Sequence, residues 1–380
     1  MSKWKAKIFD ISSIGIADVL SSGIASIFWL YIATTIGPEK YGEITYLLSI
    51  ATLASGLSLL GSNYTLMIYS AKKIQIQSTL FLLTSIVGFV AALTVFFFFV
   101  DIGLSLIILG YIILALVTSD LLGRKLYKTY SKYVILQKIL MVVFGIGFYY
   151  ILKEPGILLG ISLSYFPLIK ELIKRFKENK IDFKLLVEKK NFIFNNFALN
   201  ILGTAYSSLD KLIIAPLLGF VILGNYSLAL QFFTLMSILP NVIQKYIIPQ
   251  EATGNDNLKL KKIIILISVG IAVLGSTLGS IAISYIIPKF ETSEEIIRVV
   301  SWAIIPVTIN GVYYYPKFWA KEMNRHIVFS TTTTVSIQIL GIVTLGSMFG
   351  IFGIAISLVI AISGGVCYSF IAHKYLQKYS

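Results

Sequence analysis

The chain has 380 residues, of which 57% are hydrophobic and 13% are charged, and its mean hydropathy is +0.85. This composition excludes an ordinary soluble domain and predicts an integral membrane protein. The formal net charge is +14. However, the basic residues are spread over many loops instead of gathering on one face with aromatic residues, which argues against nucleic-acid binding.

Apolar segments follow one another along the whole chain, and we interpret about twelve of them as transmembrane helices. The first six cover approximately residues 11–36, 44–69, 78–100, 102–121, 133–152 and 155–170. The second six cover approximately residues 192–218, 221–248, 263–287, 296–316, 327–349 and 352–372. Most are long enough to cross a hydrocarbon layer of about 30 Å at about 1.5 Å per residue. We therefore predict an all-α membrane protein.

Positive charge is concentrated on alternate loops. Most of the 32 basic residues, including those near both ends of the chain, fall on one side of the predicted membrane. The loops of the other side carry only Lys40, Lys153, Lys289 and Arg298. Because cytoplasmic loops are enriched in Lys and Arg, we predict a multi-pass protein of the plasma membrane with both termini in the cytoplasm. Lys211 is the remaining basic residue, and it lies inside an apolar segment.

A long basic connection divides the chain almost in half. We predict an N-terminal six-helix half at residues 1–170, a cytoplasmic linker at 171–190 and a C-terminal six-helix half at 191–380. Such halves enter and leave on the same side, so a duplication gives repeats related by an axis along the membrane normal. A short match supports this repeat at an offset of about 182 residues, pairing Gly37, Gly42 and Thr45 with Gly219, Gly224 and Ser227.

Three charged residues lie inside predicted transmembrane helices. An ionised group at the bilayer centre costs about 2.5–3.5 kcal/mol on insertion scales, so it normally faces the protein interior or water. Asp18, Asp210 and Lys211 are in this position, and we expect them to face a cavity. Asp120 is less informative, because Arg124 follows within one turn and places it at the inner interface.

The segment 192–218 is the most polar of the set. Its polar and small residues recur at spacings of three and four, which places them on one helix face; they are Asn196, Asn200, Gly203, Ser207 and Asp210. Asn196 and Asn200 are candidates for substrate binding, with hydrogen bonding between helices as the alternative.

Asn63 and Asn310, in the second and tenth segments, are further substrate-binding candidates, although a packing role explains them equally well. No disulfide, metal site or cofactor is expected, since the chain has one cysteine and two histidines near loops. There is no phosphate-binding loop with a lysine and no pair of carboxylates on an outer loop. We therefore predict that the protein is not an enzyme.

Two motifs resemble a known family. The turn Ile36-Gly37-Pro38-Glu39-Lys40-Tyr41-Gly42 resembles the LGPEEYG turn of polysaccharide and O-antigen flippases of the Wzx type, which belong to the MOP superfamily together with the MATE exporters. The stretch from Asp210-Lys211 through Gly219 to Gly224-Asn225-Tyr226 is similar to the helix-seven pattern of the same family.

This resemblance implies a MATE-like fold and a flippase that works by alternating access. Its substrate would be an oligosaccharide on an isoprenoid diphosphate, moved from the inner to the outer leaflet. Lys211 would meet the diphosphate, Asn196 and Asn200 would bind sugar, and Asp18 and Asp210 would bind a coupling H⁺ or Na⁺.

Two alternatives stay open. The first is a MATE-like exporter of small organic cations, which requires an acidic cavity that Lys211 opposes. The second is a membrane scaffold for glycan assembly that transports nothing. Besides the substrate, we expect contact with membrane lipids and with glycan polymerases or glycosyltransferases as partners, no contact with nucleic acid, and a monomeric state.

Overall fold

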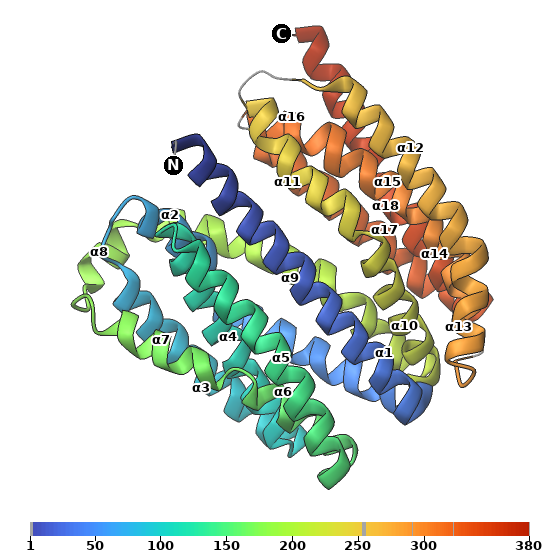
Figure 1. The fold of residues 1–380 in the computed structure, drawn as a ribbon, viewed down its shortest axis with the longest axis horizontal. Helices are drawn as coiled ribbons and strands as arrows, with labels where there is room; N and C mark the ends of the chain where they lie inside the picture. The colour runs from blue at the N-terminus through green and yellow to red at the C-terminus, as the bar shows by residue number, and fades with distance from the viewer. Residues whose placement is uncertain (1–2, 253–255, 291, 322, 380) are drawn as a thin grey trace. The chain divides into compact units, whose positions relative to one another are not determined.

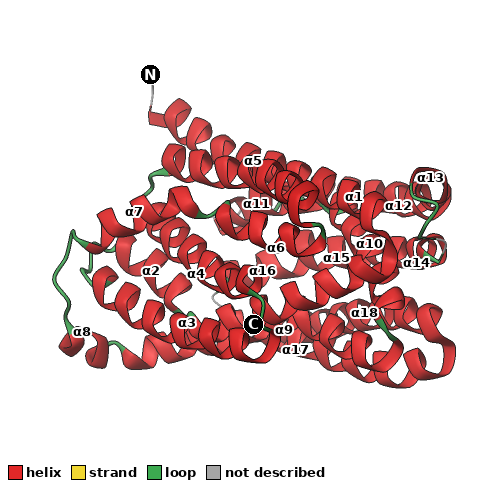
Figure 2. Ribbon diagram, turned by 90° about the horizontal axis from the view of Figure 1, so that it is seen from below, coloured by secondary structure: helices red, strands yellow, loops and turns green. Residues whose placement is uncertain are grey.

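The computed structural model describes residues 3–252, 256–290, 292–321 and 323–379. The described residues are helical almost throughout and are connected by short loops (Figure 1, Figure 2). Within these ranges there is no β-strand, and the predicted all-α fold class is confirmed.

The helices before the middle of the chain are α1 (Lys3–Ser58), α2 (Ser62–Ala71), α3 (Gln77–Phe99), α4 (Ile102–Gly123), α5 (Tyr127–Leu152), α6 (Glu154–Leu163), α7 (Phe166–Phe176) and α8 (Phe183–Glu188). Those that follow are α9 (Lys190–Leu218), α10 (Phe220–Met236), α11 (Ile238–Ala252), α12 (Leu258–Leu274), α13 (Ser280–Ile286), α14 (Ser293–Val300), α15 (Ile304–Ile309), α16 (Tyr315–Ala320), α17 (Asn324–Gly341) and α18 (Ser347–Tyr379). Short helical segments that are wound more tightly or more widely than an α-helix interrupt the second set. They are η1 (Gly275–Gly279), η2 (Ser301–Ala303), η3 (Asn310–Tyr314) and η4 (Ile342–Gly346).

Within the described residues, nine helices are long and apolar enough to cross a membrane, or ten if the bent pair α10 and α11 forms one span. Two of them, at 15–58 and 324–375, have 44 and 52 residues, which is about twice the length that a hydrocarbon layer requires. Each contains a glycine with non-helical backbone angles, Gly37 and Gly350. Counting each as two crossings would give twelve spans, a number that stays a prediction.

Contacts divide the chain into two compact units. The first contains residues 1–28 and 47–208, and the second contains residues 29–46 and 209–380. The chain therefore passes from one unit to the other inside α1 and inside α9. The predicted domain boundaries at residues 170 and 191 stay a prediction.

Within the first unit, α4 packs against α2, α3 and α6. The side chains of Leu104, Ile107, Ile108 and Leu116 are inaccessible to solvent. Within the second unit, α14 and α18 are in contact and bury Ile296 and Ile354 in the same way.

The predicted repeat is visible in the second unit as two turns of the same shape. Gly37 has φ 78° and ψ 174°, and Gly219 has φ 90° and ψ 167°. Both angles lie in a region that glycine adopts without steric cost. Each glycine ends one helical stretch, and in α1 the next residue, Pro38, suits the first turn of the next stretch because it needs no N–H acceptor there.

These two turns also contact each other reciprocally. A Cβ atom on Gly42 would lie 2.0 Å from the carbonyl oxygen of Phe220, and one on Gly224 would lie 1.9 Å from that of Pro38. Ser227 donates a hydrogen bond to Thr45 at 3.2 Å, and these two residues are 182 positions apart. Reciprocal contact between equivalent residues is typical of a two-fold relation. The two turns that the sequence match pairs are related to each other in this way.

We predict that Gly42→Ala and Gly224→Ala each destabilise the protein by at least about 1–3 kcal/mol, the usual cost of overpacking, because the new methyl group collides with backbone atoms. Thermal unfolding of the detergent-purified protein measures this effect. Gly270→Ala is the matched control, since its Cβ atom would meet nothing within 4 Å. Equal unfolding temperatures for all three variants would contradict the close contact.

Candidate functional site

The predicted site residues fall into both units, because α9 passes from the first unit to the second between residues 208 and 209. Asn63, Asn196, Asn200 and Asp18 belong to the first unit. Asp210, Lys211 and Asn310 belong to the second. The surroundings of each group are described within its own unit.

The three asparagines of the first unit are brought together at the interface of α9 with α1 and α2. Asn200 donates to the carbonyl oxygen of Gly56 at 2.7 Å and accepts from the amide of Asn63 at 3.0 Å. Asn196 donates to the hydroxyl of Thr65 at 3.1 Å. Asn196 and Asn200 are buried. Hydrogen bonding between helices is the alternative to sugar binding for Asn196 and Asn200, and these bonds are of that kind. The amide donors of both residues are therefore engaged within the first unit.

One polar atom of this group has no partner. The Oδ1 atom of Asn63 is buried and accepts no hydrogen bond from any part of the chain that the structure describes. An unpaired buried acceptor costs free energy, so a ligand donor that reached this atom would satisfy it.

Asp18 lies on α1 and accepts a hydrogen bond from the hydroxyl of Tyr130 on α5 at 3.0 Å. It is partly buried. The bond joins two helices of the first unit, and a role for Asp18 in binding a coupling ion stays a prediction.

Asp210 accepts hydrogen bonds at both of its carboxylate oxygens. The backbone N–H of Lys211 donates to its Oδ1 atom at 2.8 Å, and the Lys211 ammonium lies 3.1 Å from the same oxygen. Tyr226 on α10 donates to Oδ2 at 3.0 Å, and Gln338 on α17 donates to the Tyr226 hydroxyl at 3.3 Å. The two adjacent charges, whose pairing the sequence left open, therefore form an ion pair held by a second helix.

Asn310 lies at the start of η3, one of the wide turns that occur frequently at functional sites. Its amide is 3.5 Å from the hydroxyl of Tyr315, which in turn shares a hydrogen bond with Ser330 at 3.1 Å. The Oδ1 atom of Asn310 is buried and has no partner among the described residues. It is therefore a second buried acceptor that a ligand donor would satisfy on reaching it.

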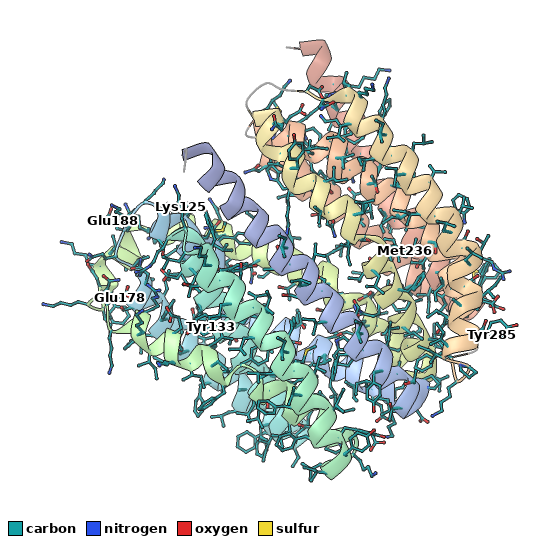
Figure 3. The ribbon with its side chains drawn as sticks, in the orientation of Figure 1. Lys125, Tyr133, Glu178, Glu188, Met236 and Tyr285 are labelled. Atoms are coloured by element: carbon teal, nitrogen blue, oxygen red, sulfur yellow. The ribbon has the colours of Figure 1, made fainter. Side chains whose placement is uncertain are left out.

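Sequence reasoning missed a group of paired charges in the first unit, of which Asp120, Glu171 and Arg175 are buried, and which we name the first ion cluster. Its members are Asp120, Arg124, Glu171, Arg175 and Glu178. Arg124 pairs with Asp120 and Glu178, and Arg175 pairs with Glu171 and Glu178. Figure 3 labels Glu178 and also Tyr133, whose hydroxyl donates to Glu171 at 3.3 Å.

The first ion cluster extends past the end of the predicted sixth segment. The sequence placed the end of that segment at residue 170, whereas α7 continues to Phe176. Within this continuation Glu171 and Arg175 form an ion pair at 2.7 Å. The spacing of four between Glu171 and Arg175, and between Asp120 and Arg124, is the helical signal that would have revealed the pairs.

A second ion cluster in the second unit consists of Glu251, Asp256, Lys261 and Lys317. Lys261 is only 1% exposed and pairs with Glu251 and Asp256, and Lys317 lies 3.5 Å from Asp256. Both ammonium groups also lie over the ring of Tyr313, at 5.6 and 4.2 Å from its centroid.

Arg175, Lys261 and Lys317 are among the basic residues on the side predicted to be cytoplasmic, and their charges are also paired within the two units. Burial opposes ionisation of Asp256, yet Lys261 and Lys317 hold the pKa of Asp256 below its ordinary value of 3.8. Within the described residues no three His, Cys, Asp or Glu side chains are placed to hold a metal ion.

Comparison with solved structures shows which proteins share this fold. The lipid II flippase MurJ in an inward closed conformation superposes with a TM-score of 0.74, covering 95% of this chain and 87% of its own, at 14% sequence identity. An inward-facing multidrug resistance MATE family transporter of the MOP superfamily gives 0.68, covering 98% and 99%, at 13% identity. The chain has the fold of the MOP superfamily transporters.

A further MOP superfamily transporter, from Pyrococcus furiosus, gives a TM-score of 0.65 over 96% of this chain and 95% of its own, at 13% identity. These three MOP-fold proteins are transporters or flippases rather than enzymes, which agrees with the sequence prediction. No protein-family model matches the sequence, and no curated protein is significantly similar to it. The fold makes the chain a multi-pass membrane protein, and the orientation of its termini stays a prediction.

We predict that Lys261→Met destabilises the protein by about 3–5 kcal/mol, because it leaves Glu251 and Asp256 without the buried cation that pairs with them. Lys262→Met is the matched control, since Lys262 is the next residue in the chain and its side chain is exposed. Thermal unfolding in detergent measures both variants. Equal losses of stability in the two variants would show that the second ion cluster does not stabilise the fold.

We also predict a pH dependence that comes from Asp256. Because its pKa is lower in the folded protein, its contribution to stability is complete above about pH 4 and is lost as pH falls through the folded pKa. The difference in unfolding temperature between wild type and Asp256→Asn should therefore stay constant above about pH 4 and shrink as the pH falls further. A difference that also stays constant below about pH 4 would show that Asp256 is not stabilised as a carboxylate.

Proposed function

We propose that this protein moves an oligosaccharide linked to an isoprenoid diphosphate from the inner to the outer leaflet by alternating access. The observation that carries the proposal is the ion pair between Lys211 and Asp210 inside an apolar helix of a MOP-type fold. An ionised pair in a membrane helix is expensive and marks a functional site by default. The similarity to a lipid II flippase over 95% of the chain supports the choice of substrate class.

The task itself requires a polar path. A glycan cannot cross hydrocarbon without leaving its hydrogen bonds unsatisfied, and each unsatisfied polar group costs several kcal/mol. In this proposal the two predicted halves, residues 1–170 and 191–380, alternate between two arrangements. These expose the polar faces of their helices first to one side of the membrane and then to the other. The isoprenoid chain stays in the lipid throughout.

Lys211 is the proposed ligand of the diphosphate. Its ammonium donates to Oδ1 of Asp210 at 3.1 Å and to Oδ2 at 3.5 Å, and Tyr226 also donates to Oδ2, at 3.0 Å. In this proposal a phosphate oxygen takes the ammonium from Asp210, which keeps its bond to Tyr226. Asp210 would then be free to take up a coupling H⁺ or Na⁺, with Asp18 as the second proposed carboxylate for this ion.

The proposed sugar contacts divide into two kinds. The Oδ1 atoms of Asn63 and Asn310 are buried and unpaired among the described residues, and they would accept from sugar hydroxyls once the helices around them part. Asn196 and Asn200 already bond to Thr65 and Gly56. They would contact sugar only when those bonds open.

A membrane potential that is negative inside contributes about 2.3 kcal/mol per charge per 100 mV to the outward movement of an anion. This contribution favours export of a diphosphate even without ion coupling. The protein would work as a monomer in the plasma membrane, with glycan polymerases or glycosyltransferases as partners.

The MATE-like fold also keeps export of small organic cations as an alternative, since the similarity to a MATE transporter covers 98% of the chain. The Lys211 ammonium disfavours a cationic substrate beside it. A scaffold for glycan assembly is the alternative from another class, and it predicts no transport at all.

The experiment is a flipping assay in liposomes with a labelled lipid-linked oligosaccharide, with and without a proton or sodium gradient. We expect transport by the wild type and a loss of about tenfold to a hundredfold in Lys211→Ala, the effect of removing one charge-assisted hydrogen bond. Lys289→Ala replaces an exposed lysine and should transport at the wild-type rate.

Each alternative has its own outcome in this assay. Uptake of a fluorescent organic cation without oligosaccharide transport would establish the exporter instead. Absence of any transport by a folded wild-type protein would favour the scaffold. Unchanged flipping in Lys211→Ala would remove the diphosphate contact while leaving the flippase activity in place.

A further inference from the structure

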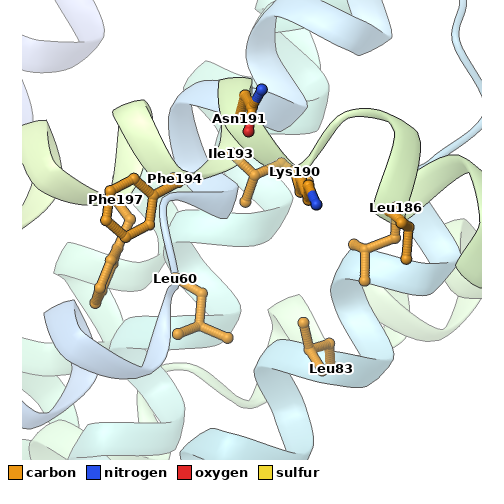
Figure 4. Close-up of a pocket in the computed structure, with 9 residues that line it drawn as sticks. Leu60, Leu83, Leu186, Lys190, Asn191, Ile193, Phe194 and Phe197 are labelled. Carbon is orange, nitrogen blue, oxygen red and sulfur yellow. The ribbon is translucent and has the colours of Figure 1, made fainter.

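An apolar groove lies within the first unit. It has a volume of about 490 Å³, and its lining residues are Leu60, Leu83, Leu186, Val187, Lys190, Asn191, Ile193, Phe194 and Phe197. In Figure 4 these side chains surround one space, with Phe194 and Phe197 on one side and Leu186 on the other. The volume lies within the range of about 300–1,000 Å³ typical of ligand sites.

A break between α1 and α2 forms one wall of the groove. Leu60 and Gly61 have positive φ values of 49° and 74°, so the backbone leaves the helical path at this point. A Cβ atom on Gly61 would lie 2.4 Å from the backbone nitrogen of Phe197. The break therefore packs directly on α9, and Leu60 faces the groove beside it.

The groove changes from polar to apolar along α9. Lys190 and Asn191 begin the helix, and Phe197 lies about 10 Å further along its axis at 1.5 Å per residue. No ion pair of Lys190 occurs among the described residues, whereas the adjacent Lys189 pairs with Glu188 at 2.6 Å. A cation at one end and aromatic and aliphatic side chains beyond it match the polarity of a lipid.

The surface around the groove has the composition of a membrane interface. Large apolar side chains are exposed beside the basic ones: Ile181, Phe183, Val187 and Phe194. Lys184 is exposed on the same short helix, α8. Exposed aromatic and aliphatic residues next to lysines are typical of segments that lie in the headgroup region of a bilayer.

We infer that this groove binds one acyl chain of an anionic phospholipid, whose phosphate lies on Lys190. A water-soluble ligand would find no polar partners beyond Lys190 and Asn191 in the groove. An anionic headgroup is selected because the adjoining segment 170–190 is rich in Lys and Arg, and such clusters attract anionic lipid. A bound chain would hold α8 against α3 and α9 in the first unit. This inference does not depend on the proposed flippase activity.

The test uses native mass spectrometry of the purified full-length protein with equal amounts of phosphatidylglycerol and phosphatidylcholine of identical acyl chains. The wild type should retain one phosphatidylglycerol. Leu186→Trp fills the groove and should lose both lipids, whereas Leu266→Trp, at an exposed position on α12, should behave as the wild type.

The charge is tested separately. Lys190→Gln should lower retention of phosphatidylglycerol about fivefold, the effect of one basic residue near an anionic headgroup, and leave phosphatidylcholine unchanged. Lys262→Gln, another exposed lysine, is its control. Because Lys190 is exposed, Lys190→Gln should fold normally. It therefore tests the inference even if Leu186→Trp does not fold.

Three results would overturn the inference. The first is retention of phosphatidylglycerol by a folded Leu186→Trp protein at the wild-type level. The second is equal retention of the two phospholipids by the wild type. The third is displacement of phosphatidylglycerol by an equal amount of an isoprenyl phosphate, which would assign the groove to the carrier lipid instead.

Discussion

A charge inside a membrane protein must find its partner within the protein, because hydrocarbon offers neither hydrogen bonds nor counter-ions. Asp210 meets this requirement with Lys211 and with the hydroxyl of Tyr226. The two ion clusters supply pairs that link α4 to α7 and α12 to α11, and Lys317 of α16 pairs with Asp256 just before α12. The paired charges therefore determine which helices of each unit are fixed to one another.

Between the two glycine turns the backbone itself makes the close contact. Gly42 and Gly224 bring two helical stretches so close that no Cβ atom fits at either position, as is common between membrane helices. The contact is reciprocal, so the two turns are held as equivalents within one unit. This equivalence gives the repeat a physical meaning: the same short sequence makes the same turn and the same contact twice.

Helix α9 connects the two proposals. One of its faces carries Asn196 and Asn200, which bond to α2 and α1, and its initial turns also present Phe194 and Phe197 to the apolar groove. Its last part carries Asp210 and Lys211 into the second unit. The same helix thus presents groups suited to sugar, to diphosphate and to an acyl chain, and it is one of the two helices in which the chain passes between the units.

The sequence by itself determined the membrane class, the helical fold and the glycine turns, because hydropathy and turn chemistry are properties of short segments. It also indicated Asp210 and Lys211, since a charge within an apolar run is visible without knowing its neighbours. Only the tertiary structure decided that Lys261 is buried and that Asn63 bonds to Asn200, 137 residues away. Burial and pairing depend on contacts between helices that are distant in the chain, and no local pattern records which helices those are.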